Sequence, residues 1–319
     1  MATQPDGAWH FGKVLNVEPQ LGPVDLRVCE SGPARGVVEF TRQVRKSRIT
    51  QRVSLAAGSP AVDFEIAIDW KELGKNLAPS PLMRIAMDAD FETTPVATYE
   101  IPFGSIERPL SEHERVALKW ADLSDGRFGI SLLNDCKHGY TAEGWTLRMT
   151  LVRASAFPDP EPDQYLQTIR YTLYPHEGGW KNAETVALAA ALNHPVVTRV
   201  VEGGSGPRDL PAEISFVGAG ARNVAISGVK RAEDDDDLVV RFFEMNGEAA
   251  RSEIATTWPV TGAARVNFLE DDLGAASTTE KGVPIELRGH EIQTLKLRLK
   301  AVPGVSMTGT RGPEPPRDF

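Results

Sequence analysis

One short segment of the sequence gathers side chains of the types that bind sugars. In Leu132-Leu-Asn-Asp-Cys-Lys-His-Gly-Tyr140 an apolar run is followed by an amide, a carboxylate, an ammonium, an imidazole and a phenol, and the segment closes beside a glycine. Sugar hydroxyl groups need converging hydrogen-bonding groups, and the faces of sugar rings need aromatic surface. The other interpretation is a hairpin loop in which Asn134 and Asp135 hydrogen-bond their own backbone. Composition leaves both interpretations open.

No other set of residues predicts catalysis within the chain. The six histidines lack the spacing of a zinc site, and the four aspartates at 234–237 lack the turn glycine and distal glutamate of a calcium loop. We interpret the aspartate run as a solvated hairpin tip. No nucleophile-elbow pattern is found, and spacing singles out no pair of carboxylates for glycoside hydrolysis. We therefore predict no catalytic residue and no metal ligand in this chain.

Charge and composition narrow the class of partners. The 319 residues carry a formal charge of -9, which disfavours nucleic acid and anionic membranes because such surfaces attract basic proteins. No apolar run approaches the roughly 20 residues that span a bilayer, and the first residues lack the parts of a signal peptide. We therefore expect a cytoplasmic protein. Cys29 and Cys136 are too few for a disulfide framework, and we expect free, partly buried thiols.

The elements that must position the polar segment are strands. Phe64, Ile66 and Ile68 alternate with polar residues, as do Met149 and Leu151, and this period of two is typical of half-buried strands that share a core. Similar runs predict further strands at 37–44, 49–55, 82–91, 128–133 and 168–174. The pattern therefore favours a large antiparallel sheet system. One helix is expected over 183–192, capped by Asn182.

A composition change divides the chain into two β domains. Residues 1–200 form the larger predicted domain, and the Gly-, Pro- and Ser-rich stretch 201–211 is typical of a linker. Residues 212–300 form the smaller domain, with strands expected at 213–217, 224–229, 238–244 and 292–299. The last residues, 301–319, are interpreted as a tail.

Several blocks of sequence, taken in order, resemble a known family. They include Tyr99-Glu-Ile-Pro-Phe-Gly-Ser-Ile-Glu-Arg-Pro109, Gly129-Ile-Ser-Leu-Leu-Asn-Asp-Cys-Lys-His-Gly-Tyr140, Tyr171-Thr-Leu-Tyr-Pro-His176 and Val240-Arg-Phe-Phe-Glu244. Together these blocks resemble the C-terminal region of α-mannosidases of glycoside hydrolase family 38, over about residues 5–300. Their number and order make the resemblance more specific than any single motif.

The resemblance implies a fold, a function and a set of partners. The implied fold is all-β, with a galactose-mutarotase-like supersandwich followed by a smaller β-sandwich. The implied parent is a retaining α-mannosidase whose N-terminal domain, missing here, supplies a zinc ion and the nucleophile. Its partners are then a mannose-containing carbohydrate and its own N-terminal catalytic domain, with a homo-oligomer left open.

Four residues are carried over from the resemblance as contacts to the sugar pocket: Asn134, Asp135, Lys137 and Tyr140. We expect their loop to face the missing catalytic domain, with polar groups poorly satisfied within this chain. The chain alone is then an inactive fragment. Two alternatives stay open: a free-standing carbohydrate-binding or scaffold protein, and a mutarotase-like epimerase that uses a histidine and a glutamate.

Overall fold

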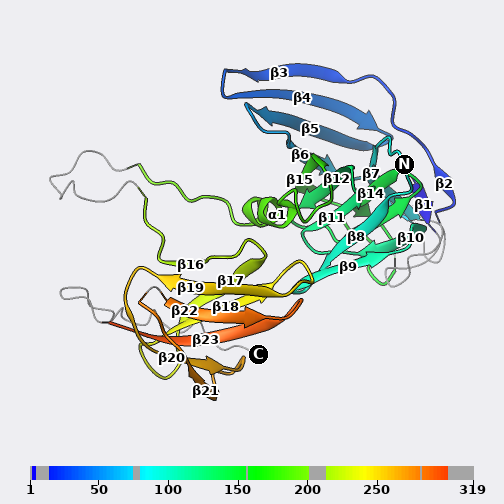
Figure 1. Cartoon of the computed structure of the whole chain (residues 1–319). Helices are drawn as coiled ribbons and strands as arrows, with labels where there is room; N and C mark the ends of the chain where they lie inside the picture. Colours follow the sequence, from blue (N-terminus) through cyan, green and yellow to red (C-terminus); the bar gives the residue numbers. More distant parts are fainter. Residues whose placement is uncertain are drawn as a thin grey trace. The chain divides into compact units, whose positions relative to one another are not determined.

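The computed structural model describes residues 2–4, 14–74, 80–155, 157–200, 213–280 and 282–300. The expected linker at 201–211 and the expected tail at 301–319 lie outside the described residues. The chain divides into two compact units, residues 1–200 and residues 201–319, and nearly every described element in both units is a strand (Figure 1). None of the described helices has the length and apolar character to cross a membrane.

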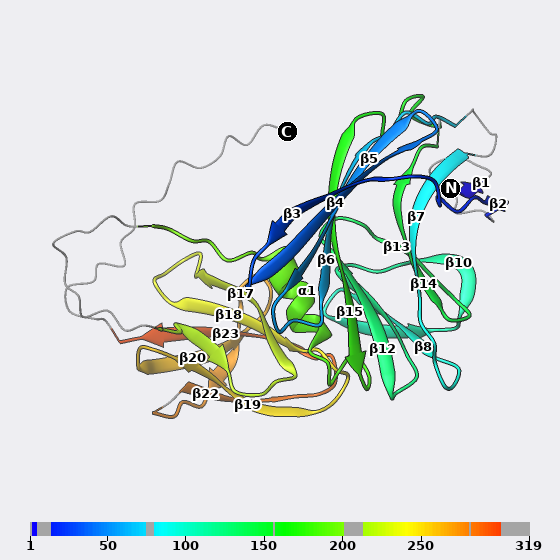
Figure 2. The same cartoon turned by 90° about the horizontal axis from the view of Figure 1, so that it is seen from above.

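The first unit contains two antiparallel sheets, which Figure 2 shows from a second direction. The larger sheet has nine strands in the spatial order β3 (Asp25–Ser31), β4 (Arg35–Val44), β5 (Ser47–Ala56), β6 (Val62–Asp69), β15 (Leu166–Glu177), β12 (Phe128–Asn134), β11 (Trp120–Ser124), β8 (Val96–Ile101) and β9 (Gly104–Arg108). The smaller sheet has six strands in the order β10 (Ser111–Val116), β13 (Gly139–Glu143), β14 (Thr146–Arg153), β7 (Ser80–Asp88), β1 (Ala2–Gln4) and β2 (Asn16–Val17).

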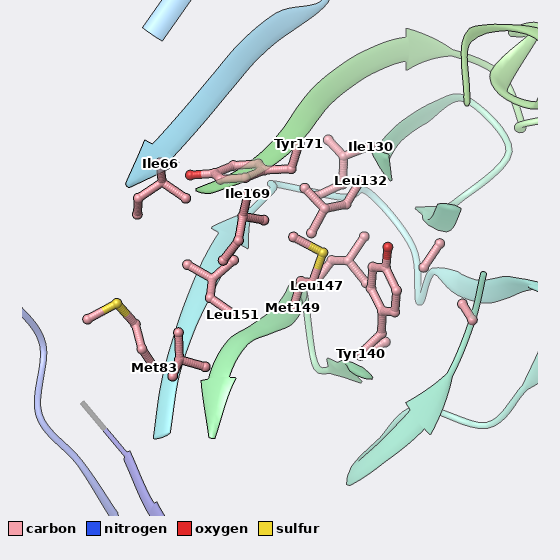
Figure 3. Packing of buried hydrophobic residues seen from close by; sticks show 14 of the residues in the cluster. Ile66, Met83, Ile130, Leu132, Tyr140, Leu147, Met149, Leu151, Ile169 and Tyr171 are labelled. Atoms are coloured by element: carbon pink, nitrogen blue, oxygen red, sulfur yellow. The ribbon is translucent and has the colours of Figure 1, made fainter. Parts of the chain in front are cut away.

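The core of the first unit is made from both sheets. Ile66 and Ile68 of β6 join Met149 and Leu151 of β14 in one buried cluster, and Phe64 packs against it partly buried. Figure 3 shows the side chains of Ile66, Met149 and Leu151 with those of Tyr140 and Tyr171. The alternation in sequence thus predicted the inward faces correctly, because each strand has one face toward the core.

The opposite face of the nine-stranded sheet carries the helix α1 (Thr185–Asn193). Ala189 of this helix packs with Trp120 of β11, Leu133 of β12 and Trp180. The helix was predicted, but the cap was wrong. The residue before the helix is Glu184, whose φ of 60° is left-handed. Its side chain forms no capping hydrogen bond at the N-terminal end of the helix. Asn182 instead lies in a turn, where its backbone N–H donates to the carbonyl of Gly179, so the helix begins later.

The second unit also contains two antiparallel sheets. One has the order β16 (Val217–Ala219), β19 (Ala250–Thr256) and β22 (Gly282–Leu287), and the other has β17 (Val224–Arg231), β18 (Leu238–Glu244), β23 (Ile292–Leu299), β20 (Val260–Val266) and β21 (Asp272–Ala276). Side chains from both sheets form its core. The strand expected at 213–217 was wrong, because pairing with β19 begins only at Val217.

The aspartates at 234–237 lie between β17 and β18, at the tip of a hairpin as predicted. Asp235 forms an ion pair with Lys296 at 2.6 Å, and Asp237 lies 3.5 Å from Arg298. Basic side chains of β23 therefore balance part of this charge. The cysteines differ from expectation: Cys29 and Cys136 are free but exposed, since one lies on the edge strand β3 and the other in a connection between sheets.

Candidate functional site

The segment that the sequence singles out connects the two sheets of the first unit. Strand β12, which ends at Asn134, belongs to the nine-stranded sheet, while β13, which begins at Gly139, belongs to the six-stranded sheet. Residues 135–138 therefore form a short bridge between them, and we call them the bridge loop. Because its two ends are fixed in different sheets, the loop is held on rigid elements, as a binding site requires.

The side chain of Asn134 holds the backbone of the bridge loop through hydrogen bonds. Its amide nitrogen donates to the backbone oxygen of Leu118 at 3.0 Å and to the hydroxyl of Tyr140, and its amide oxygen accepts from the backbone N–H groups of Cys136, at 2.8 Å, and Lys137. The alternative interpretation of the sequence, an asparagine that bonds its own backbone neighbours, therefore describes part of what Asn134 does.

Asn134 and Tyr140 are both buried, in contrast to the expectation of a loop with unsatisfied polar groups. Asn134 retains 1% of its accessible surface and Tyr140 none, and each side chain has its hydrogen-bond partner inside the unit. Burial raises the pKa of the Tyr140 phenol far above its ordinary value, so it stays protonated. The expectation was wrong for these two residues because they follow the inward face of their strands.

Asp135 and Lys137 lie further out. The Arg170 guanidinium of β15 donates from Nε to the Asp135 carboxylate at 2.8 Å, and the backbone N–H of Arg170 reaches the other carboxylate oxygen at 3.3 Å. The Asp135 side chain keeps 18% of its surface exposed, and the half-buried Lys137 donates to the amide oxygen of Gln167 at 3.3 Å. These two residues present a carboxylate and an ammonium on a fixed backbone.

The thiol of Cys136, between these two residues, has low reactivity near neutral pH. Partial burial of the sulfur, together with a hydrogen bond to the negative Asp135 carboxylate, raises the pKa of Cys136 from 9.0 to about 11. Both causes favour the neutral thiol over the thiolate. Cys136 is therefore a poor nucleophile near neutral pH, although the residue is exposed.

Glycine is required where the bridge loop enters β13. A Cβ atom on Gly139 would overlap the carboxylate of Glu114 on the neighbouring strand β10. That carboxylate is buried. It accepts a hydrogen bond of 2.8 Å from the hydroxyl of Thr150 and forms an ion pair with Arg84. Glycine at position 139 therefore lets the buried carboxylate of Glu114 approach the backbone closely.

Arg170 also belongs to a row of alternating charges that crosses the outer face of the nine-stranded sheet. Directly paired positions on successive strands, continued by the loop residue at the end of β12, give the row Arg27, Glu39, Arg52, Glu65, Arg170 and Asp135. Four neighbouring pairs in the row form ion pairs: Arg27–Glu39 at 2.9 Å, Arg52–Glu39 at 2.8 Å, Arg52–Glu65 at 3.6 Å and Arg170–Asp135 at 2.8 Å. We call these six residues the charge row.

A groove of about 490 Å³ lies beside the charge row, between its strands and α1. Its lining includes Asp63, Glu65 and Arg170 from the sheet and Leu188 and Leu192 from the helix. Arg170 thus both holds Asp135 and lines the groove. Sequence reasoning missed Arg170, because a single arginine in an alternating strand is indistinguishable from any solvent-facing residue until the strand register is known.

A second polar cluster lies buried under α1. The Asp122 carboxylate accepts from His176 at 2.8 Å and from the Ser131 hydroxyl at 2.7 Å, and Ser131 lies 2.8 Å from the Thr185 hydroxyl. The same His176 nitrogen lies 3.1 Å from Ser131, so one nitrogen faces both partners, unlike a catalytic triad in which two ring nitrogens divide these roles. The cluster fastens the start of α1 to the sheet.

The end of α1 is fastened to the candidate site itself. The Asn193 side chain donates to the backbone oxygens of Asn134 and Ala189, each at 2.9 Å. Among the described residues, no group of three histidine, cysteine, aspartate or glutamate side chains is arranged to hold a metal ion. The site is therefore a supported polar loop and an adjoining groove, built from residues of one unit.

Two units, each built from antiparallel sheets that share a core, define a protein of the β-sandwich class. Comparison with family models specifies the class: residues 2–161 match the glycosyl hydrolases family 38 C-terminal domain, and residues 223–295 match the glycosyl hydrolases family 38 C-terminal beta sandwich domain. The first match spans half of the chain. The chain belongs to glycosyl hydrolase family 38, as its C-terminal region.

Relatives and solved structures agree with this assignment. Alpha-mannosidase 2C1 of Mus musculus is 30% identical over 298 residues, and that of Homo sapiens is 31% identical over 300 residues; each match covers 90% of this chain. The chain spans only 28% of the length of these curated relatives. A family 38 protein from Enterococcus faecalis has the same fold over 93% of this chain and 40% of its own, with a TM-score of 0.72 at 20% identity.

Proposed function

We propose that this chain is the non-catalytic C-terminal part of a retaining α-mannosidase, and that its bridge loop forms part of the wall of the mannoside pocket. The observation that carries this proposal is that both the Asp135 side chain and the backbone of its loop are held in place. Its carboxylate is held by Arg170 at 2.8 Å, while the loop backbone is held by the buried Asn134. The fixed, partly exposed carboxylate of Asp135 can accept hydrogen bonds from sugar hydroxyls, and the ammonium of Lys137 can donate to them, without reorganisation.

The four carried-over residues then divide into two pairs. Asp135 and Lys137 are the proposed contacts to the sugar, because their charged groups reach the surface of the unit. Asn134 and Tyr140 are positioning residues, because they are buried and hold the loop through its backbone and through each other. The nucleophile and the zinc ion belong to the catalytic part of the enzyme, as the family resemblance implies.

The same proposal names the partners. A mannose-containing carbohydrate is the ligand, the catalytic part of the family 38 enzyme is the macromolecular partner, and a second copy of the chain is a further one. The cytoplasm is the proposed location.

Two assays test the proposal. The chain alone, given an aryl α-mannoside and zinc, is expected to show no turnover, and metal-dependent turnover would overturn its non-catalytic role. The second assay uses the complete enzyme that the proposal implies. There, Asp135→Ala should lower kcat/KM by about tenfold or more, since a charged hydrogen bond is worth about 1.5–3 kcal/mol. The matched control is Asp25→Ala on β3, and equal activity of the two variants would remove Asp135 from the pocket.

The alternatives differ in what the chain does by itself. A free-standing carbohydrate-binding protein would bind a mannose oligosaccharide without a partner, which calorimetry on the chain alone measures. A mutarotase-like epimerase needs a histidine and an acid that reach the sugar. The His176 and Asp122 pair does not favour this reaction, because both side chains are buried beneath α1.

A further inference from the structure

The groove beside α1 has a row of polar side chains on its floor. Ser54 of β5, Asp63 of β6 and Thr172 of β15 are directly paired positions, and all three line the groove. Each lies two residues along its strand from a member of the charge row, so the three side chains share the outer face of the sheet with that row. We call these three residues the polar row.

The polar row contains an acceptor that is held in place and open to a ligand. Thr172, which is 4% exposed, donates from its hydroxyl to Oδ1 of Asp63 at 2.6 Å. Asp63 itself is exposed, and within the described part of the chain its Oδ2 atom accepts no hydrogen bond. The arginines of the charge row that line the groove differ, because they already form ion pairs inside the unit. Asp63 is therefore well placed to accept hydrogen bonds from a bound molecule.

The wall of the groove is aliphatic and is fixed before any ligand arrives. Leu188, Ala191 and Leu192 of α1 form it. The start of the helix is held through the hydroxyl of Thr185, and its end through the side chain of Asn193. An aliphatic wall over a polar floor suits a pyranose, since the ring has apolar C–H faces and carries its hydroxyls around the edge.

The groove continues in two directions. At one end Arg170 lines it and also holds Asp135, the proposed sugar contact of the bridge loop. At the other end Arg35, Ser54 and Glu65 also line a second groove of about 460 Å³, which extends to β3 and β4. Each volume is typical of small-molecule sites, which measure about 300–1,000 Å³. The outer face therefore has room for more than one sugar unit beside the bridge loop.

We propose that the groove is a subsite for the sugar units that carry the mannose to be released. Asp63 accepts from their hydroxyls, and Leu188 and Leu192 pack against a ring face. This inference rests on the proposed function and extends it, because it makes an oligosaccharide the substrate. The continuity with the pocket wall through Arg170 is the reason to choose a sugar as the occupant. No bond is made or broken in the groove, so its residues only bind.

The test compares two substrates of the complete enzyme. An aryl α-mannoside has no second sugar, whereas an α-linked mannotriose reaches the groove. Ser54→Tyr fills the groove with a residue that strands accept, and it should lower kcat/KM for mannotriose by about tenfold or more, because binding by the remote part of the substrate is lost. Asp63→Ala should lower it by about tenfold through the lost charged acceptor. With the aryl α-mannoside both variants should stay within about twofold of the original enzyme.

Thr50→Tyr is the matched control, since Thr50 lies on the same strand and face as Ser54 but lines neither groove. It should change neither activity. Mannotriose activity that is unchanged in both groove variants, as expected if the groove takes a protein segment, would overturn the proposal. An equal loss on both substrates would overturn it too, because the substitutions would then act through the pocket or the fold. Asp135→Ala should lower both activities, so the pocket and the groove can fail separately.

Discussion

The side chain of Asn193, the last residue of α1, donates a hydrogen bond of 2.9 Å to the backbone oxygen of Asn134, the last residue of β12. The helix end and the base of the bridge loop are thereby joined on the outer side of the sheet. On the inner side, the Asn134 side chain bonds Tyr140. The loop is therefore fixed from both faces of the nine-stranded sheet.

The first prediction concerns Asn193. Asn193→Ala removes both side-chain hydrogen bonds and should lower the free energy of unfolding by about 1–2 kcal/mol. The backbone amides of residues 135–138 should exchange with solvent faster, which hydrogen exchange measures. Asn182→Ala is the control: Asn182 is exposed and caps nothing, so a change below about 0.5 kcal/mol is expected. A larger loss in the control than in Asn193→Ala would contradict this account of α1.

The second prediction compares Asn134 and Tyr140. Asn134→Ala leaves two backbone N–H groups, a carbonyl and a buried hydroxyl without their partner, so we expect a loss of about 2–4 kcal/mol in urea unfolding. Tyr140→Phe removes only the hydroxyl and should cost about 1 kcal/mol. Equal costs would mean that the backbone bonds of the loop contribute nothing.

The third prediction concerns the reactivity of Cys136. With a pKa of about 11, its thiolate fraction rises tenfold for each pH unit up to that value, so iodoacetamide should modify it slowly near neutral pH and faster in alkali. Asp135→Asn removes the negative charge that favours the neutral thiol. It should therefore lower the pKa of Cys136 and speed the reaction at a fixed pH. Cys29→Ser isolates the signal of Cys136, and an unchanged rate in Asp135→Asn would contradict the stated cause.

The fourth prediction concerns Glu244 in the second unit. This fully buried carboxylate accepts hydrogen bonds from the side chain of Asn223 and from the backbone N–H groups of Asn246, Gly247, Glu248 and His290. Burial alone would raise the pKa of Glu244, but these donors together hold it below its ordinary value of 4.5.

Because the pKa of Glu244 is lower in the folded state, its contribution to stability is complete above the unfolded value and is lost as the pH falls through the folded value. Glu244→Gln should cost about 1–3 kcal/mol near neutral pH and should flatten the acid part of the stability curve. Urea unfolding of both proteins across the acid range measures this. A variant with an unchanged slope would show that another acid determines it.

The sequence predicted the strands of this protein better than the roles of its polar residues. Alternation identifies Ile66 and Met149 as inward-facing because burial is repeated every second residue. It does not tell which strand lies beside which, and so it missed Arg170, whose role depends on the neighbouring Asp135 from a distant segment. The start of α1 was missed because Glu184 takes a left-handed conformation that its residue type does not indicate.

Within the candidate site, residue types indicated a polar loop but not how deeply each of its side chains is buried. Asn134 and Asp135 are neighbours in sequence, yet one side chain lies in the core and the other near the surface. This follows from the alternation of β12, which the loop continues for one more residue. Counting forward from Leu132, a core residue, would place Asn134 inside and Asp135 outside.

The bridge loop has only four residues between strands of different sheets, and this shortness gives it a mechanical role. A tether of that length transmits any sliding of one sheet over the other directly to Asp135 and Lys137. A substitution in the interior, such as at Met149, which pairs with Tyr140 between β14 and β13, therefore changes the geometry of the loop without a contact to its charged side chains. If the loop contacts sugar as we propose, the residues that determine this contact include those of the sandwich core as well as those of the loop.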